Sequence, residues 1–143
     1  MMNELERAQR CADKMLQADR ASRSLGIDVE IPAAGSAVAR MFVRKDMVNG
    51  FDICHGGLVF ALADTAFAFA CNAYDDLTVA GGGNIEFLRP GLRGDELTAV
   101  ATELHRNRKG GLYKVEIHNQ DNKLVALFQG RSVSRGEAIL EQD

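Results

Sequence analysis

The chain has 143 residues, which is enough for one domain of ordinary size. Hydrophobic residues make up 46% and charged residues 26% of it, a composition typical of a globular protein with a packed core. The formal net charge is −3 and the pI is about 5.6, so the basic surface of a nucleic-acid-binding protein is not expected. No apolar run reaches the ~18 residues of a membrane helix, and the mixed-charge N-terminus lacks the pattern of a signal or transit peptide. We therefore expect a cytoplasmic protein with neither nucleic-acid nor membrane partners.

Cysteine and histidine positions do not predict a metal site. The cysteines Cys11, Cys54 and Cys71 are odd in number and far apart, and no cysteine or histidine pair has the spacing of metal ligands. This pattern favours a reducing compartment without disulfides. Cys54 adjoins His55, but neighbours in a chain usually point apart and no third residue orients the pair, so a cysteine nucleophile is disfavoured.

The first predicted element is an amphipathic helix over residues 3–24, where apolar residues recur at threes and fours until Gly26. Two short strands follow it, and the first is recognisable by its alternation of apolar and polar residues. Their predicted ranges are 27–31 and 37–43, with a turn at 32–35. The turn pair Asn49-Gly50 then marks a loop over residues 46–54.

The segment from residue 56 to about residue 72 is apolar on every side and predicts a buried helix. It reads GGLVFALADTAFAFACN, with only Asp64 and Thr65 as polar interruptions before its end. About 16 residues correspond to a helix of ~24 Å. This is too short for a membrane span and carries an acid near its middle. We expect it in the core of the domain.

The rest of the chain predicts four long strands joined by short polar connections, which implies antiparallel neighbours. Their ranges are 78–88, 95–105, 112–119 and 124–134. The economical way to bury the apolar helix is to curl this sheet around it. The prediction is an α+β domain over residues 1–143, in which an antiparallel sheet wraps a long central helix, with an extra N-terminal helix.

Asp64 is the first candidate for chemistry. An ionised carboxylate among apolar neighbours such as Phe60 and Phe67 is costly unless a partner or a function compensates for it. The alternative is a structural aspartate, hydrogen-bonded at a turn of the sheet or at a subunit contact.

The pair Gly56-Gly57 at the predicted start of the central helix is the second candidate. Unpaired N–H groups of a helix N-terminus suit an anion or a developing oxyanion, although the pair is also compatible with a simple entry turn. Asp64 lies eight positions after Gly56, about 12 Å along a helix, so one chain cannot easily bring the two together. Two antiparallel helices would, which predicts a site shared across a two-fold dimer.

Several motifs together now carry a family resemblance. They are Asn49, His55-Gly56-Gly57, Leu62-Ala63-Asp64, Asn84-Ile85-Glu86-Phe87-Leu88-Arg89-Pro90 and Gly94-Asp95. The chain resembles hotdog-fold acyl-CoA thioesterases of the PaaI type, the phenylacetyl-CoA thioesterases of phenylacetate catabolism. The similarity extends from the N-terminal helix to about Arg135.

This resemblance implies a set of roles. The Gly56 N–H would hold the oxyanion of the thioester carbonyl. Asp64 of a partner subunit would act either as a nucleophile that forms a mixed anhydride or as a general base for water, and the sequence does not choose between them. Asn49 would orient the water or the carboxylate, His55 would support the loop or bond near the carbonyl, and Gly57 would let the thioester approach.

Coenzyme A, which belongs to the substrate and is no separate cofactor, needs cations for its phosphates. Arg89 lies in a predicted turn, and family analogy favours Arg108, Lys109 and Gly110 in the connection 106–111. Each of these residues is equally compatible with a solvated turn.

The run Gly81-Gly82-Gly83 departs from relatives that carry a serine or threonine facing the thioester. Either the helper hydroxyl is absent, or Gly82 and Gly83 open space for a bulky acyl group, which fits an aryl ring. By analogy we expect phenylacetyl-CoA or its ring-modified forms as substrate, and a tetramer made of two dimers. The alternatives are a hydratase of the same fold, which we rank lower, and an acyl-CoA-binding or regulatory module without catalysis.

Overall fold

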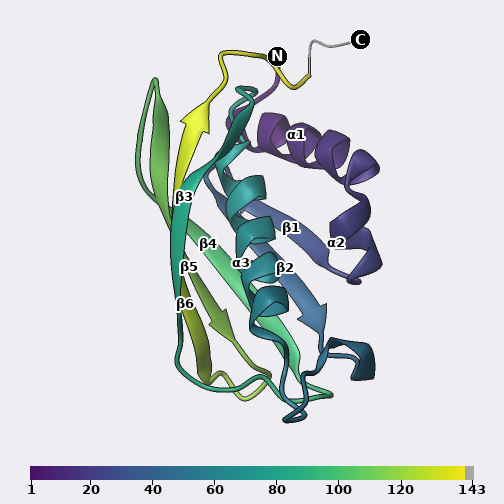
Figure 1. The fold of residues 1–143 in the computed structure, drawn as a ribbon. Coiled ribbons are helices and arrows are strands. Elements are labelled where there is room, and N and C mark those ends of the chain that lie inside the picture. The colour runs from purple at the N-terminus through teal and green to yellow at the C-terminus, as the bar shows by residue number, and fades with distance from the viewer. Residues whose placement is uncertain (141–143) are drawn as a thin grey trace.

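The computed structural model describes residues 1–140 and contains one six-stranded antiparallel sheet wrapped around a central helix (Figure 1). The strand order is β1-β2-β4-β5-β6-β3. The strands are β1 (Asp28–Ala33), β2 (Ser36–Phe42), β3 (Thr78–Phe87), β4 (Glu96–Asn107), β5 (Gly110–His118) and β6 (Leu124–Ser134). The helices are α1 (Glu4–Ala18), α2 (Arg20–Ser24) and α3 (Gly56–Cys71), with a 3-10 turn η1 at Lys45–Met47. The predicted α+β architecture is confirmed.

The core lies between α3 and the concave face of the sheet. The alanines of β2 and β4 that face the helix are fully buried, and their small side chains let α3 approach the sheet closely. On the other side, the ring of Phe67 packs at 5.6 Å from Tyr113 and 5.7 Å from Phe128, measured between ring centroids. Burying a side chain such as Phe67 contributes roughly 2–3 kcal/mol. The all-round apolar composition of α3 is therefore explained by burial on most of its surface.

The single helix predicted over residues 3–24 is two helices in the structure. Asp19 lies between them in an extended conformation and caps α2, because its Oδ1 accepts the backbone N–H of Ser22 at 2.9 Å. Asp19 also fits the polar side of one continuous amphipathic helix, so the pattern alone did not predict the break. Ser22 is only 4% exposed, and its hydroxyl lies 3.3 Å from that of Thr65, which seats α2 against α3.

Pro32 was predicted to open a turn, but β1 continues through Ala33. β1 is an edge strand, where the missing N–H of a proline is tolerated, and the pairing with β2 is irregular between Glu30 and Ala33. β4 and β5 are also longer than predicted, since only Arg108 and Lys109 form the turn between them.

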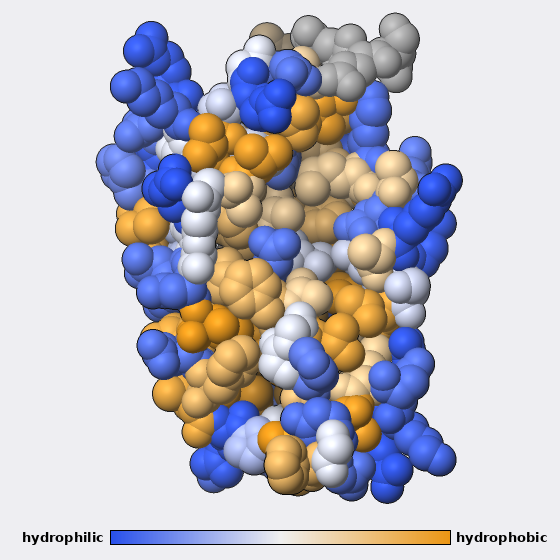
Figure 2. All heavy atoms as spheres, in the orientation of Figure 1, coloured by the Kyte–Doolittle hydropathy of each residue, from blue (hydrophilic) through white to orange (hydrophobic). Residues whose placement is uncertain are grey.

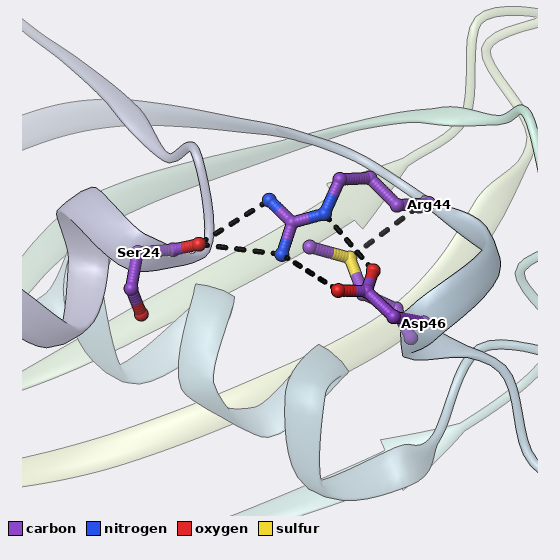
Figure 3. Close-up of polar contacts among 4 residues, drawn as sticks. Ser24, Arg44 and Asp46 are labelled. Carbon is purple, nitrogen blue, oxygen red and sulfur yellow. Dashed lines mark hydrogen bonds and ion pairs between the residues drawn. The ribbon is translucent and has the colours of Figure 1, made fainter.

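Arg44 ties the N-terminal helices to the loop that leads towards α3 (Figure 3). Both of its terminal nitrogens donate to the carbonyl oxygen of Ser24 at 3.2 Å, and its Nε donates to Asp46 Oδ1 at 3.0 Å. The hydrogen bond from Arg44 holds the pKa of the exposed Asp46 carboxyl below its usual value. The loop after β2 is therefore fastened to the end of α2.

The strand directions place different loops at the two ends of α3 (Figure 1). The loops before α3 and between β3 and β4 meet at its N-terminal end, where Cys54 N–H donates to the Gly91 carbonyl at 2.7 Å. The β4–β5 turn lies at the C-terminal end, where Ser134 N–H donates to the Lys109 carbonyl at 2.8 Å. No described helix is both long and apolar enough to cross a membrane.

Candidate active site

Within residues 1–140, the first turn of α3 leaves one backbone donor unpaired. His55 is the N-cap, and its ring Nδ1 accepts the N–H of Gly57 at 2.9 Å. The N–H groups of Leu58 and Val59 both donate to the His55 carbonyl oxygen. Among the residues that the structure describes, none accepts the N–H of Gly56. Of the two glycines proposed at the start of this helix, only Gly56 therefore has a donor free for a ligand.

The His55 ring has a defined tautomer in this arrangement. A nitrogen that accepts a hydrogen bond carries no proton, so the proton of the neutral ring lies on Nε2, which remains a donor. The backbone N–H of His55 donates to the Met47 carbonyl at 2.9 Å, in the loop that Arg44 fastens. The cap of α3 is thus held by the preceding loop.

Asn49 shapes the loop before α3. Its Oδ1 accepts the N–H of Phe51 at 2.9 Å and that of Ile53 at 3.4 Å. Its Nδ2 has no acceptor within residues 1–140 and remains available as a donor. Asn49 can therefore fix the loop and still contact a ligand.

Asn49 and Gly56 line one cavity of about 360 Å³ at the N-terminal end of α3. The rest of its lining is mainly apolar: Ile53, Cys54, Val59, Phe87, Leu88, Arg89, Pro90, Gly91 and Val125. Sequence reasoning quoted Phe87 and Leu88 only as part of a motif and gave them no place in the site. A mainly apolar cavity with a few convergent polar groups is the usual form of a small-molecule site.

Asp64 lies in the middle of α3, away from this cavity. It is half-buried, and no hydrogen bond or ion pair joins its carboxylate to the rest of the described chain. Burial raises the pKa of this carboxyl above the ordinary value. Since Asp64 is about 12 Å from Gly56 along the helix, one chain does not bring the two candidate groups together.

The three glycines of β3 have different environments. A Cβ on Gly81 would lie 2.6 Å from Arg131, whose Nη2 donates to the Gly81 carbonyl at 2.7 Å. A Cβ on Gly83 would lie 3.0 Å from the Phe128 ring, whereas one on Gly82 would meet nothing closer than 3.7 Å. Packing explains Gly81 and Gly83, and Gly82 is the position with room to spare. Neither Gly82 nor Gly83 lines the Gly56 cavity.

The residues predicted to contact coenzyme A lie at both ends of α3. Arg89 lines the Gly56 cavity and lies two residues after the end of β3. Arg108, Lys109 and Gly110 lie at the opposite end, where Lys109 and Gly110 line a second cavity of about 360 Å³. A Cβ on Gly110 would collide with the carbonyl oxygen of Ser132, so this glycine also has a packing reason.

Comparison with known proteins identifies the family. Residues 51–126, over half of the chain, match the thioesterase superfamily. The chain belongs to this superfamily. It is 47% identical over 128 residues to the acyl-coenzyme A thioesterase PaaI of Escherichia coli K12, covering 90% of this chain and 91% of that protein.

Solved structures of the thioesterase superfamily agree with this assignment. The structure of the E. coli PaaI protein from the phenylacetic acid degradation operon has a TM-score of 0.93 and 44% identity, covering 95% of this chain and 99% of the other. A mutant of the phenylacetic acid degradation protein PaaI from Thermus thermophilus has a TM-score of 0.77 and 36% identity, with 80% and 98% coverage. The predicted PaaI-type hotdog family and the prediction of a thioester hydrolase are confirmed.

Metal ligands do not gather in the part of the chain that the structure describes, since no three of its His, Cys, Asp and Glu residues are placed to hold an ion.

Proposed function

We propose that this protein hydrolyses aryl-acyl-CoA thioesters, with each active site shared by two subunits. The observation that carries the proposal is that α3 holds two reactive polar groups, one at its N-terminal end and one near its middle. Gly56, whose N–H has no acceptor within residues 1–140, lines a mainly apolar cavity, and Asp64 carries a half-buried carboxylate with no partner in the same part of the chain. Each is a costly feature by itself, and together they are the two halves of a hydrolytic site.

A second copy of the chain would complete the site. Two antiparallel α3 helices would bring the Asp64 of each subunit to the Gly56 of the other. Hydrophobic side chains gather over α3 and the neighbouring strands, with charged residues around the rim (Figure 2). β3 is an exposed edge strand of ten residues at the end of the sheet, so it has backbone groups ready to pair. These features fit a two-fold dimer, and two such dimers would form the tetramer expected by analogy.

Hydrolysis would begin with the thioester carbonyl oxygen at the Gly56 N–H. As an oxygen nucleophile adds to the carbonyl carbon, negative charge moves onto that oxygen, and the N–H stabilises it. Asp64 of the partner subunit either adds directly, giving a mixed anhydride that water then cleaves, or removes a proton from the attacking water. The carbon–sulfur bond breaks and coenzyme A leaves as the thiol. No cofactor beyond the substrate is required.

Asn49 and His55 would assist at the same end of the helix. The free Nδ2 of Asn49 and the Nε2–H of His55 are donors that can orient the water or the carbonyl. Gly57 contributes by leaving room, since its own N–H is taken by His55.

An aryl substituent on the acyl group is supported by the apolar walls of the cavity and by similarity to PaaI, a protein of a phenylacetic acid degradation operon. Arg89 at the cavity is our first candidate for a phosphate contact, and the remote Arg108 and Lys109 could reach coenzyme A only in an assembly. The free cysteines Cys11, Cys54 and Cys71 fit the cytoplasmic location that we propose.

Thiol release from an acyl-CoA panel tests this function. We expect wild-type protein to prefer phenylacetyl-CoA over long straight chains, and Asp64→Asn to lose about 10²-fold or more in kcat while staying folded. If neither protein releases thiol although both bind acyl-CoA, the chain is a binding module and Asp64 is structural. A preference for long chains would remove the aryl assignment alone.

Mixing two inactive variants tests the shared site. Proline fits the first position of a helix but has no N–H, so Gly56→Pro deletes the donor while preserving α3. A mixed dimer of Gly56→Pro and Asp64→Asn chains has one intact site out of two, and an equal mixture should recover about a quarter of wild-type activity by random pairing. Recovery that never exceeds the sum of the separate variants would exclude a shared site.

A further inference from the structure

Phe87 is a large aromatic residue that the fold leaves 54% exposed, although it lies beside the start of α3. It ends β3 and pairs with the fully buried Ala126, which directs its ring to the side of the sheet that faces the helix. Three of its ring carbons lie 3.2, 3.6 and 3.7 Å from the place a Cβ on Gly56 would occupy. The tip of the ring therefore abuts the residue that carries the free N–H.

Two backbone hydrogen bonds hold the chain directly after Phe87. The N–H groups of Leu88 and Arg89 both donate to the Val125 carbonyl oxygen, at 2.9 and 3.2 Å, which anchors the chain directly after Phe87. Val125 and Phe87 then form part of the apolar wall of the cavity into which Gly56 faces. The ring adjoins the space beside Gly56 where a Cβ would lie.

We propose that Phe87 is a positioning residue, which shields the Gly56 N–H from water and limits movement of the first turn of α3. The inference rests on the proposed function, since it assigns the exposed ring a task at the oxyanion donor. A hydrogen bond to a developing charge is stronger where water is excluded, because the local dielectric constant is lower. Glycine at position 56 is what allows the ring to come this close.

Kinetics of three variants test the proposal. Phe87→Ala should lower kcat about tenfold, less than the ~10²-fold that loss of a whole donor costs, with KM changed by less than about threefold. Phe87→Leu keeps an apolar side chain against Gly56 and should recover most of this loss. The matched control is Phe42→Ala, since Phe42 is 56% exposed, ends β2 and does not line the cavity. We expect the control to keep wild-type kcat.

The exchange of the Gly56 amide with water, followed by NMR of ¹⁵N-glycine-labelled protein, gives a readout that does not depend on turnover. Exchange should be several times faster in Phe87→Ala than in wild type, intermediate in Phe87→Leu and unchanged in Phe42→Ala. Wild-type exchange and kcat in Phe87→Ala would overturn the inference, as would equal losses in the Phe42 control. If wild type releases no thiol from any acyl-CoA, the proposed function fails, and the exchange rates still decide whether Phe87 shields Gly56.

Discussion

The two ends of α3 differ in whether their polar groups are hydrogen-bonded within the chain. At the C-terminal end, Asn72 is 3% exposed, and its Nδ2 donates to the carbonyl oxygens of Ala68 at 2.9 Å and Thr78 at 3.1 Å. Its Oδ1 accepts the N–H of Thr78 at 2.8 Å, and the Thr78 hydroxyl donates to Cys71 Sγ at 3.0 Å. At the N-terminal end, by contrast, the Gly56 N–H has no acceptor among the described residues.

The same contrast extends to the surroundings of each end. Beyond Asn72, the hydroxyls of Tyr74 and Tyr113 donate to one carboxylate oxygen of Glu103 at 2.7 and 3.0 Å. The cavity beside these two tyrosines measures only about 10 Å³, and the larger cavity at this end lies by Lys109 and Gly110 instead. Burial, with Glu103 beside it, raises the pKa of Tyr74 to about 12, so Tyr74 stays a donor at neutral pH. The C-terminal end uses its polar groups to stabilise the fold, whereas the N-terminal end leaves groups unpaired at a cost that a ligand can repay.

Deleting the donor at the N-terminal end should have the largest effect. Gly56→Pro should lower kcat by about 10²- to 10³-fold, because one oxyanion donor is lost while the helix still starts in place. Gly56→Ala is the matched variant, since it keeps the N–H and adds a Cβ 3.2 Å from the Phe87 ring. Because only the position of that ring is disturbed, its loss in kcat should be no larger than the roughly tenfold loss expected for Phe87→Ala. Steady-state kinetics that show equal losses in both variants would mean that space matters at this position and the donor does not.

Breaking the network at the other end should change stability and leave catalysis alone. Asn72→Ala removes four side-chain hydrogen bonds, the weakest of them to Cys71 Sγ at 3.7 Å, and leaves the buried backbone groups of Thr78 unpaired. The free energy of unfolding should fall by about 2–3 kcal/mol. Urea unfolding at one protein concentration measures this loss. We expect kcat to stay within about twofold of wild type, and a larger fall would show that the two ends are coupled.

How far the sequence predicts this contrast depends on the residue. The apolar run around Asp64 predicted a central helix, and the short polar connections after it predicted antiparallel strands. The helix break at Asp19 was not predicted, because a capping aspartate and a solvent-facing one give the same helical pattern. The continuation of β1 through Pro32 was not predicted either, because only an edge strand tolerates proline and the sequence does not show which strand is at the edge. Which of two adjacent glycines keeps its N–H free depends on the rotamer of His55, which no sequence pattern encodes.

The placement of Arg108 and Lys109 could have been predicted by counting strand directions. β3 returns the chain from the end of α3 to its start, and β4 then carries it back to the far end. The β4–β5 turn must therefore lie opposite Gly56 in one chain. The family resemblance placed these cations near the substrate without that check.

His55 should have an intermediate effect, because it stabilises the start of α3. His55→Ala removes the acceptor for the Gly57 N–H and should lower the free energy of unfolding by about 1 kcal/mol. Asparagine is a good N-cap, so His55→Asn should restore stability. It lacks the Nε2–H proposed to orient the water or the carbonyl, so its kcat should stay about tenfold below that of wild type. A His55→Asn protein with wild-type kcat would show instead that His55 acts only as the cap of α3.

The burial of Asp64 should make both the stability of the protein and its kcat depend on pH. Because the folded-state pKa is raised above the ordinary value of 3.8, the folded protein binds this proton more readily than the unfolded chain. Stability should then fall as pH rises from 3.8 through the folded-state pKa, and Asp64→Asn should be more stable than wild type at pH 7. The difference should disappear below pH 3.8, and the kcat of wild type should decline on acidification at a pH above 3.8. An Asp64→Asn protein less stable than wild type at pH 7 would mean that the ionised carboxylate has a stabilising partner in the assembly.

The smallest change in stability is expected at Gly82. A side chain there tests whether the glycine leaves room for the acyl group, because close packing does not explain it. The Cβ that Gly82→Ser adds meets no heavy atom closer than 3.7 Å, and the change should alter the free energy of unfolding by less than about 0.5 kcal/mol. Gly83→Ser, the matched control, would press on the Phe128 ring, which Phe60 holds at 5.4 Å between centroids, and should cost about 2 kcal/mol. If Gly82 leaves space for an aryl group, Gly82→Ser should lower kcat/KM for phenylacetyl-CoA more than for acetyl-CoA. An unchanged ratio would leave Gly82 without a role in selecting the acyl group, and the selectivity would then have to come from the walls of the Gly56 cavity.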